Sequence, residues 1–545
     1  MLLNNSLSPS QRNGIVTLVH KGGDKCLLEN WRPITLLCVD YKIFTRIIVA
    51  RIKPLLCKFI SVEQHCGVEG RSIIDCNIML RDLLTYVTDR NMEFGMVNLD
   101  FKQAFDCVDV TFIFSTLRAL GFSNKFINCI KMLYTGITSK LKINNMIGDK
   151  FAILKGVRQG CPLSMILFII YQESLYRLIK QTNRITPIQL PNKVDINLLG
   201  YADDTNVFIS KDKDLKVLYE MLDVFCEVTG ARINTRKTKI MGFGKWKNKI
   251  IWPENKFTPE QTSLKCLGIN YYNELEDTVD NNWALIEKNM NAHIRCIMQR
   301  PLTIFQKSFY INSVILSKMV YTASIIPIKS VIVKRLVKCI FDYVWNGRYN
   351  PIKREYMYLP KHKGGLGIQN IENKCNSILL KSFLKMYAKE NDFTKFIAYF
   401  CESRLKAILP KNVDEISYVI HPYYNKILDL CRNVMHIEVF PILTCKIIYG
   451  VLNPEIKPAI EENFPLYRWK CIWKNIHSKL IDRYDRVVCF KFIYNVLPSK
   501  KKLYEMKITG YDNPLCVTCN LPESNLHMFY FCSKIKSLFR FIKCL

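Results

Sequence analysis

Residues 198–210, LLGYADDTNVFIS, contain two short apolar runs with Ala202, Asp203 and Asp204 between them. Short apolar runs on either side of a few turn-forming residues are typical of paired strands. The segment therefore predicts a β-hairpin that carries two adjacent acids at its tip. Acids are common in turns, so the pair alone would indicate only a solvated turn. Its meaning depends on what lies beside the hairpin.

A third acid follows another apolar strand. Residues 95–99, GMVNL, predict a short strand that ends at Asp100. If the hairpin pairs beside this strand, Asp100 and Asp203 project into one cleft. Carboxylates so close together repel one another unless they bind divalent cations, and oxygen ligands of this kind suit Mg²⁺. The three acids therefore predict a site for two-metal phosphoryl transfer.

The segment GVRQGCPLS, residues 156–164, leads into an apolar helix. Gly156 and Gly160 predict places where the backbone closely approaches a ligand, and Gln159 offers an amide near the start of the helix. The alternative interpretation is an ordinary loop with a proline at a helix entry.

Net charge narrows the class of partner. The 545 residues carry a formal charge of +31, and 49% of them are hydrophobic, which excludes a disordered basic tail. This excess of positive charge favours a polyanionic partner, and nucleic acid is the first candidate. The alternative is a basic protein kept soluble by its charge. The N-terminal residues do not resemble a signal peptide, and no run approaches the roughly 18 apolar residues that span a membrane. We therefore expect a protein with no membrane partner that is not secreted and is located in the nucleus and cytoplasm.

The pattern along the chain predicts an α+β fold. Strand and helix patterns alternate up to about residue 270, and the chain is almost wholly helical from about 280. Asp109 and Ser123 are predicted to cap two successive helices, the first ending at Gly121. Strands at 141–143 and 151–154 are predicted to form a hairpin through Asn144 and Asn145. Residues 346–367 form a basic, Gly-rich loop where we expect a boundary.

The C-terminal part contains Cys516, Cys519, His527 and Cys532 in C-x2-C-x7-H-x4-C spacing. Two thiolates two residues apart chelate a metal, and the later His and Cys complete a tetrahedron, so the spacing predicts a structural Zn²⁺ site. The alternative is a chance C-x2-C among 22 cysteines. The expected role of the ion is local folding.

Taken together, these motifs resemble those of reverse transcriptases of non-LTR (LINE-type) retrotransposons. Further segments match that family in order and spacing: NWRPITLLCVDYKIFTRIIVARIKPLL at 30–56, EQHCGVEGRSIIDCN at 63–77, TGARINTRKTKIMGFG at 229–244 and KCLGINY at 265–271. The resemblance implies a right-hand polymerase followed by a helical extension and a small zinc-binding tail. It also implies that this tail binds template RNA or target DNA. The expected parts are fingers and palm at 1–273, thumb at 274–345, helical C-terminal extension at 346–505 and a zinc-knuckle-like segment at 506–545.

The resemblance also assigns roles to residues. Asp100, Asp203 and Asp204 are the catalytic carboxylates and hold two Mg²⁺ ions, or Mn²⁺, with the carbonyl of Phe101 as a further ligand. The remaining expected site residues are Lys21 and Arg32 on the incoming triphosphate, Gln159 beside the nascent base pair and Lys237 as an acid toward pyrophosphate. Lys237 is also one of seven basic residues in the acid-free window 231–250, a predicted electrostatic track for phosphates.

Phe105 is the residue expected to distinguish deoxynucleotides from ribonucleotides. A bulky aromatic residue there stacks under the sugar and collides with a 2′-hydroxyl, so the resemblance implies dNTPs as substrates, an RNA template and a DNA primer or target. The alternative for Phe105 is a core residue on a helix face. Asp106 favours a competing interpretation, an RNA-dependent RNA polymerase, but the sequence YADD resembles reverse transcriptases instead.

The chain departs from its family at a few places. Many relatives have Asp where this chain has Cys161 and Pro where it has Met165. Relatives also carry an endonuclease ahead of the polymerase, and no segment here resembles one, so the sequence is interpreted as truncated at its N-terminus. A catalytically decayed or repurposed nucleic-acid-binding copy is therefore the second functional class. Nothing in the sequence indicates the oligomeric state.

Overall fold

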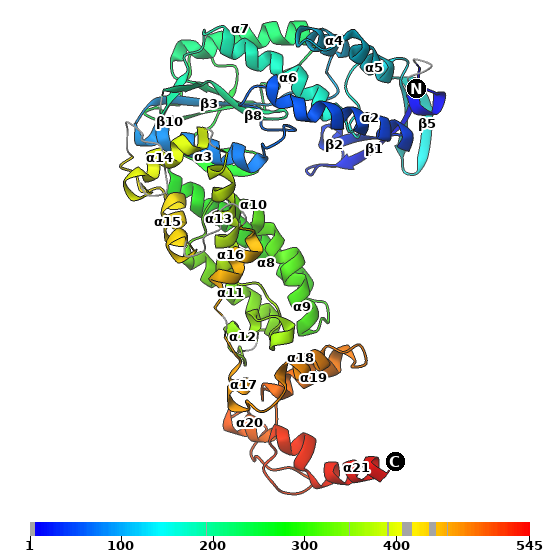
Figure 1. Cartoon of the computed structure of the whole chain (residues 1–545), viewed down its shortest axis with the longest axis vertical. Coiled ribbons are helices and arrows are strands. Elements are labelled where there is room, and N and C mark those ends of the chain that lie inside the picture. The colour runs from blue at the N-terminus through cyan, green and yellow to red at the C-terminus, as the bar shows by residue number, and fades with distance from the viewer. Residues whose placement is uncertain are drawn as a thin grey trace. The chain divides into compact units, whose positions relative to one another are not determined.

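The computed structural model describes residues 6–544 apart from 192, 348, 390–391, 406–416, 435–442 and 455. The chain divides into two compact units, which we call the first unit (Met1–Asn282 with Ser382–Cys431) and the second unit (Trp283–Lys381 with Arg432–Leu545). The first unit is mixed α/β and contains the sheets, whereas the second is built from helices (Figure 1). The functional division into fingers, palm, thumb, extension and tail stays a prediction.

A five-stranded sheet forms the centre of the first unit, in the order β11-β10-β3-β9-β8. Its strands are β3 (Glu93–Leu99), β8 (Leu198–Tyr201), β9 (Asp204–Ile209), β10 (Lys239–Gly244) and β11 (Thr258–Pro259). β3 lies between β9 and β10 and is antiparallel to both. The predicted hairpin and its pairing beside the strand that ends at Asp100 are therefore confirmed.

Alternation along β3 explains why helices cover both faces of this sheet. Val97 and Leu99 join the main core, whereas Phe94 packs against Phe208 and Phe243 on the opposite side. α3 (Ile73–Asp89) covers one face, and α6 (Ser164–Gln181) and α7 (Asp212–Thr229) cover the other (Figure 1). Because α6 is packed on several sides, most of its residues are buried, and its sequence reads as a continuous apolar run.

A second sheet has the order β2-β1-β4-β5. It consists of β1 (Asn13–His20), β2 (Trp31–Leu36), β4 (Thr138–Ile143) and β5 (Met146–Ala152). Asn144 and Asn145 connect β4 to β5 with φ angles of 49° and 64°, the left-handed geometry of a two-residue hairpin turn. The predicted turn is confirmed, but the predicted strand 151–154 is wrong, because the second strand starts directly after the turn and ends at Ala152.

The predicted helix caps are confirmed. The Asp109 side chain accepts a hydrogen bond from the backbone N–H of Thr111 at the start of α4 (Val110–Ala119). Ser123 accepts one from Phe126 at the start of α5 (Asn124–Tyr134). The other elements before residue 275 are α1 (Pro9–Arg12), α2 (Val39–Ile52), β6 (Ile188–Leu190), β7 (Val194–Ile196), β12 (Ser263–Cys266) and β13 (Ile269–Tyr272).

Residues far along the chain return to the first unit. α14 (Asp392–Leu405) and the part of α15 (Pro422–Val434) up to Cys431 pack with it. The Tyr424 hydroxyl donates to Asp82 of α3 over 2.7 Å, and His421 lies 3.2 Å from the same carboxylate, which also pairs with Arg81. All four side chains are buried, and a buried carboxylate is tolerated only when it is paired and hydrogen-bonded in this way.

In the second unit, the described residues form helices and loops without a regular strand, which confirms the predicted change of pattern. The long helices are α8 (Leu275–Met298, which begins in the first unit), α11 (Ser330–Trp345) and α13 (Ile371–Tyr387). The shorter ones are α9 (Ile304–Tyr310), α10 (Val320–Ile325), α12 (Arg354–Tyr358), α16 (Cys445–Leu452), α17 (Ala459–Asn463), α18 (Trp469–Ile476), α19 (Arg483–Ile493), α20 (Lys500–Glu505) and α21 (Ser533–Cys544). Within the described ranges, no helix has the length and apolar character needed to cross a membrane.

Candidate active site

The three predicted carboxylates meet at one edge of the central sheet. Asp100 directly follows β3, and Asp203 and Asp204 lie at the β8–β9 turn, where Tyr201 pairs with Asp204. Only Ala202 and Asp203 lie between the paired residues, so the turn is tight. Ala202 has a φ of 54°, an uncommon conformation for a residue with a side chain.

Gln64 holds this turn in place. Its side-chain oxygen accepts hydrogen bonds from the backbone N–H groups of Ala202 and Cys66, each over 3.0 Å. The residues around it bridge to β8, because the backbone N–H of His65 donates to Gly200 and that of Gly200 donates to Glu63. Gln64 is only 1% exposed, so these bonds are not exchanged for water. In the sequence this segment is marked only by its resemblance to a family, and the positioning role of Gln64 is not predictable from it.

Asp100 is positioned from the other side by the segment after α7. Its backbone N–H donates to the Thr238 hydroxyl over 3.1 Å, and its carbonyl accepts from the Asn234 N–H over 2.8 Å. Burial raises the pKa of the Asp100 carboxyl, and Asp203 adds to the rise, while Asn234 and Lys237 oppose it.

The carboxylates disfavour one another's ionised forms. Burial raises the pKa of Asp204 to about 6, and the charges of Asp203 and Asp100 contribute to that rise. Part of the Asp204 side chain nevertheless stays open to solvent in the cleft. Three oxygen-bearing acids that cannot all ionise without cost are the donor set that suits a hard divalent cation such as Mg²⁺.

A cleft of about 1360 Å³ lies in front of these acids. It is lined by every residue that the sequence analysis assigned to nucleotide and catalytic metal: Lys21, Arg32, Asp100, Phe101, Phe105, Gln159, Asp203, Asp204 and Lys237. These residues come from both sheets and from loops between positions 21 and 237. Their gathering in one cleft is a structural fact, whereas their individual roles stay predictions.

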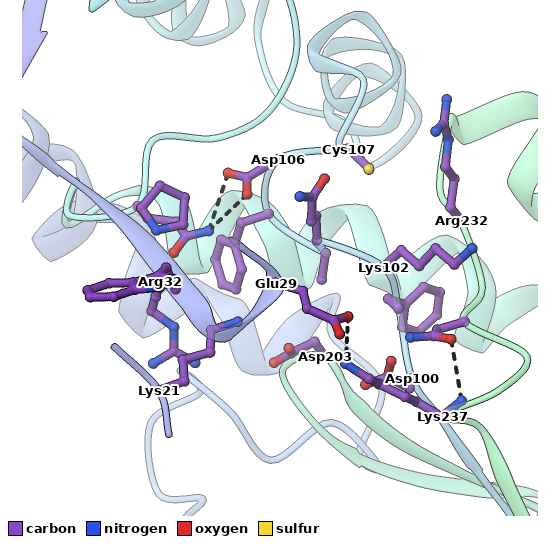
Figure 2. A pocket seen from close by; sticks show the side chains of 18 of the residues that line it. Lys21, Glu29, Arg32, Asp100, Lys102, Asp106, Cys107, Asp203, Arg232 and Lys237 are labelled. Atoms are coloured by element: carbon purple, nitrogen blue, oxygen red, sulfur yellow. Dashed lines mark hydrogen bonds and ion pairs between the residues drawn. The ribbon is translucent and has the colours of Figure 1, made fainter. Parts of the chain in front are cut away.

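Basic side chains face the acids across this cleft. Arg32 pairs with Val19 in the β1–β2 register, and Lys21 follows directly after β1 (Figure 2). Both are exposed, and neither forms an ion pair within the described residues. Lys21 is near enough to Asp100 to lower the pKa of that carboxyl. The cleft therefore presents one negative edge and one positive edge, the arrangement needed to hold metal-bound phosphates.

Lys237 is engaged by an acid that the sequence analysis missed. Its Nζ lies 3.4 Å from the Glu29 carboxylate, which lines the same cleft (Figure 2). Glu29 belongs to a short 3₁₀ turn, Leu28–Asn30, just before β2. Both side chains are more than half exposed, so the pair contributes little to stability and is easily exchanged for a phosphate.

The basic window at 231–250 is less available than its sequence indicates. Five of its seven cations pair with carboxylates; besides Lys237 with Glu29, the pairs are Lys239–Glu260, Lys245–Glu93, Lys247–Glu274 and Lys249–Asp212. Arg232 and Arg236 are exposed and line the cleft. These pairs join largely exposed side chains to acids distant in sequence, so the role of the window as an electrostatic track for phosphates stays a prediction.

Phe105 lies where it could contact a nucleotide sugar and is also partly a core residue, so both predicted interpretations remain. Its ring stacks on Phe168 of α6, with centroids 4.6 Å apart and planes 19° from parallel, so one face belongs to the core. The side chain is only half-buried and also lines the cleft. The next residue, Asp106, accepts hydrogen bonds from Gln159 Nε2 at both carboxylate oxygens, over 3.2 and 3.3 Å. This carboxylate is therefore already engaged, which disfavours the role in ribose selection considered for it.

Gly156 and Gly160 allow close contacts within the chain. A Cβ at Gly156 would lie 2.8 Å from the carbonyl oxygen of Asp106, and one at Gly160 would lie 2.5 Å from that of Thr35. Both residues have positive φ angles, 88° and 114°. The space that glycine provides is thus filled by the chain's own backbone, and the Thr35 N–H of β2 donates to Gln159 O over 2.7 Å. Gly160 also lines the cleft, so the close approach of its backbone to a ligand stays a prediction.

A separate candidate metal centre lies in the second unit. The ligand atoms of Cys516, Cys519, His527 and Cys532 all lie within 4.8 Å of one another. Cys519 Sγ is 3.1 Å from His527 Nε2, and the two other sulfurs are 4.0 Å apart. A tetrahedral ion with bonds of about 2.0–2.3 Å fits at the centre of such a group, and three thiols with one imidazole are a donor set that zinc prefers. The predicted cluster is therefore assembled.

The chain is similar in sequence to known proteins. The family model for reverse transcriptase (RNA-dependent DNA polymerase) matches residues 19–271. Over 391 residues the chain is 28% identical to an uncharacterised 149 kDa protein of transposon TX1 from Xenopus laevis, covering 70% of this chain and 29% of that protein. It is 24% identical over 390 residues to a Pol polyprotein from a type-1 R2 retrotransposable element of Popillia japonica, covering 67% and 52%.

A third relative is the Pol polyprotein from the type-2 element R2DM of Drosophila melanogaster, 24% identical over 51% of this chain and 26% of the relative. The chain thus spans between about a quarter and about half of the length of these three relatives. Among solved structures, telomerase from Candida tropicalis with a fragment of telomeric RNA is 13% identical, covers 72% of this chain and 64% of that one, and has a TM-score of 0.38. A TM-score this low supports no further inference.

Proposed function

We propose that the chain is the RNA-directed DNA polymerase of a non-LTR retrotransposon. The match of residues 19–271 to the reverse transcriptase family model and the similarity to non-LTR retrotransposon proteins support this proposal. In this proposal it extends a DNA primer on an RNA template with dNTPs. The observation that carries the proposal is the single cleft in which three carboxylates from two neighbouring strand ends face Lys21 and Arg32.

In this proposal the acids hold the catalytic metal. Asp100, Asp203 and Asp204, with the Phe101 carbonyl, would hold two Mg²⁺ ions, or Mn²⁺ in their place. Two such ions, when bound, activate a primer 3′-hydroxyl and stabilise the pyrophosphate leaving group. The donor set supports this assignment, because burial and the neighbouring carboxylates raise the pKa values of Asp100 and Asp204, and a bound cation would favour their ionised forms.

The other cleft residues act on the nucleotide. Arg32 offers a planar fork and Lys21 a point charge to the triphosphate, while Gln159 supports the loop beside the nascent base pair. The Phe105 ring, held against Phe168, blocks the space that a 2′-hydroxyl would need. Lys237 Nζ leaves Glu29 when a triphosphate enters and donates a proton to the departing pyrophosphate.

The remaining parts support substrate handling. We propose that Cys516, Cys519, His527 and Cys532 hold a structural Zn²⁺ ion and that the folded segment binds template RNA or target DNA. The division into a right hand with fingers and palm, thumb, extension and tail, and a location in the nucleus and cytoplasm, belong to the same proposal.

The direct test is extension of oligo(dT) on poly(A) with dTTP and Mg²⁺, with Asp203→Asn as the matched control. We expect template-dependent extension that the variant lacks. Binding of the primer-template without extension by the wild-type chain would instead select a decayed or repurposed nucleic-acid-binding protein. Extension with UTP in preference to dTTP would select an RNA-dependent RNA polymerase.

A further inference from the structure

The second unit contains a pocket that the proposed polymerase chemistry does not use. It has a volume of about 550 Å³, within the range of about 300–1,000 Å³ typical of ligand pockets. It is lined by the end of α8, the following loop and α9, by Lys361, by His477 just after α18, and by the first turn of α19. Segments almost 190 residues apart in the sequence therefore build one site, as the contact between Phe305 and His477, with ring centroids 4.9 Å apart, shows directly.

The pocket carries an excess of positive charge. Arg300, Lys361, Arg483 and Arg486 line it, and no aspartate or glutamate does so among the described residues. None of these four cations forms an ion pair in the described part of the chain. Asp482 lies nearby and caps α19, accepting a hydrogen bond from the Tyr484 N–H over 2.7 Å. This hydrogen bond lowers the pKa of the Asp482 carboxyl, and the charges of Arg483 and Arg486 contribute to the lowering. Four cations beside this one acid leave an excess of positive charge, which favours a ligand that carries several negative charges.

An aromatic face lies among these cations. The Phe309 side chain on α9 lines the pocket and is 71% exposed. One turn earlier, Phe305 is buried against His477 and Phe490, and Lys361 Nζ lies 5.9 Å from the Phe305 ring centre. Exposure of an apolar ring to water is unfavourable, and its flat face is available for stacking with another ring. Interleaved cations and aromatic rings are the combination by which proteins hold unpaired nucleotides, with phosphates on the cations and a base on the ring.

We propose that this pocket binds a single-stranded segment of polynucleotide, RNA or DNA, with one base stacked on Phe309 and its phosphates on Arg300, Lys361 and Arg483. A duplex does not fit this chemistry, because its bases are stacked on one another and cannot offer a face to Phe309. The inference deepens the proposed function, on which it rests for the kind of polymer, by giving the chain a second nucleic-acid contact besides the catalytic cleft.

The experiment measures binding without catalysis, so that it stays informative if the polymerase proposal fails. Fluorescence anisotropy with 12-nucleotide RNA, 12-nucleotide DNA and a 12-base-pair DNA duplex is recorded with the full chain carrying Asp203→Asn, in EDTA-free buffer without added divalent cation or dNTP. The test variants are Arg300→Ala with Lys361→Ala and Arg483→Ala, and Phe309→Leu alone. The matched controls are Lys288→Ala with Lys334→Ala and Lys338→Ala, exposed cations of the same unit outside the pocket, and Phe309→Trp.

We expect the triple pocket variant to bind the single strands about tenfold or more weakly. The slope of log affinity against log salt concentration should become shallower by about 2, because three phosphate contacts are lost. Phe309→Leu should weaken binding about fivefold or more, and Phe309→Trp should retain it. The proposal is overturned if the control triple weakens binding as much as the pocket triple. It is also overturned if Phe309→Leu has no effect, if the duplex competes as well as the single strands, or if a poly-glutamate peptide of equal charge binds as tightly. Thermal melting of each variant excludes unfolding as the cause.

Discussion

The acids of the cleft and the Cys/His cluster of the tail both bring metal-binding side chains together, but they are held in different ways. Behind the acids, β9 is buried from Thr205 to Ile209, and Gln64 and Thr238 fix the chain at the strand ends. In the described residues 506–538, by contrast, only four residues are buried: Cys516, Asn525, His527 and Cys532. Three of these four belong to the cluster itself.

The difference predicts what each metal does. The cleft keeps its geometry through a core and hydrogen bonds, so metal binding there supplies chemistry and not stability. The tail has almost no apolar core, and Val517, Leu521 and Leu526 are all more than half exposed. A segment of this kind needs a metal to fold, as small metal-bound domains do.

The largest expected effect is therefore on the tail. Replacing Cys519 and Cys532 by Ser should abolish zinc binding and unfold the tail completely, while extension of a short preformed primer-template stays within about twofold of wild type. Hydrogen exchange of peptides from 513–532 and metal analysis measure the first result, and primer extension measures the second.

Cys471→Ser is the matched control, because this cysteine is exposed and lies outside the cluster. If the purified chain contains no zinc and the two ligand replacements leave hydrogen exchange in the tail unchanged, the tail does not need a metal to fold, and the proposed difference between the two sites is wrong.

Gln64→Ala is expected to lower the extension rate by about 10- to 100-fold, because it releases the turn that carries Asp203. The loss should fall on kcat more than on KM for dNTP, since no nucleotide-binding group is removed. Steady-state kinetics measure this split, and Gln181→Ala, an exposed position at the end of α6, is the control. A rate equal to that of the control would show that the hairpin is held by the sheet alone.

Phe105→Val is expected to raise incorporation of rNTP relative to dNTP by about tenfold or more, because it opens the space beside the sugar. Phe112→Val removes the same volume from a half-buried ring of α4 that does not line the cleft. Single-nucleotide incorporation from each nucleotide type gives the ratio. An unchanged ratio would leave Phe105 as a core residue only.

The pKa of Asp204 gives the smallest predicted effect. Because this carboxyl has a folded-state pKa of about 6, above its usual 3.8, it takes up a proton as the pH falls through 6. A protonated carboxyl does not bind a cation, so the apparent affinity for Mg²⁺ should fall about tenfold between pH 7 and pH 5. Mg²⁺ titrations of extension activity at both pH values measure it, and an affinity independent of pH would contradict the assignment.

The same raised pKa has a consequence for stability. A raised acid pKa means that the ionised form is disfavoured in the folded chain, so stability contributed by protonated Asp204 is lost as the pH rises from about 4 to about 6. At pH 7.5, Asp204→Asn should therefore melt at the same temperature as wild type or slightly higher, as is common for residues kept for function.

Much of this molecule was predictable because its signals are local. Short apolar runs beside acids in 95–100 and 198–210 predict three strands and the acids at their ends correctly, and Asp109 and Ser123 cap the expected helices. The spacing of four Cys and His residues likewise predicted a cluster that the fold assembles.

The remainder depends on contacts between residues far apart in the sequence, which leave no periodic pattern. Glu29 reaches Lys237 across 208 positions, and Tyr424 reaches Asp82 across 342. Gln64 is a single polar residue whose buried bonds to Ala202 appear only once the sheet is formed. The sequence likewise does not show that the backbone of Thr35 packs closely against Gly160.

The most direct test of the account is single-turnover incorporation of one dTMP on an RNA template by wild type and by Asp204→Asn, with melting temperatures from the same samples. If the carboxylates act in the chemistry and not in the fold, the variant should lose about a thousandfold or more in rate with no fall in melting temperature. A rate within about tenfold of wild type, or a loss of activity that follows a lower melting temperature, would contradict the assignment of this cleft as the polymerase active site.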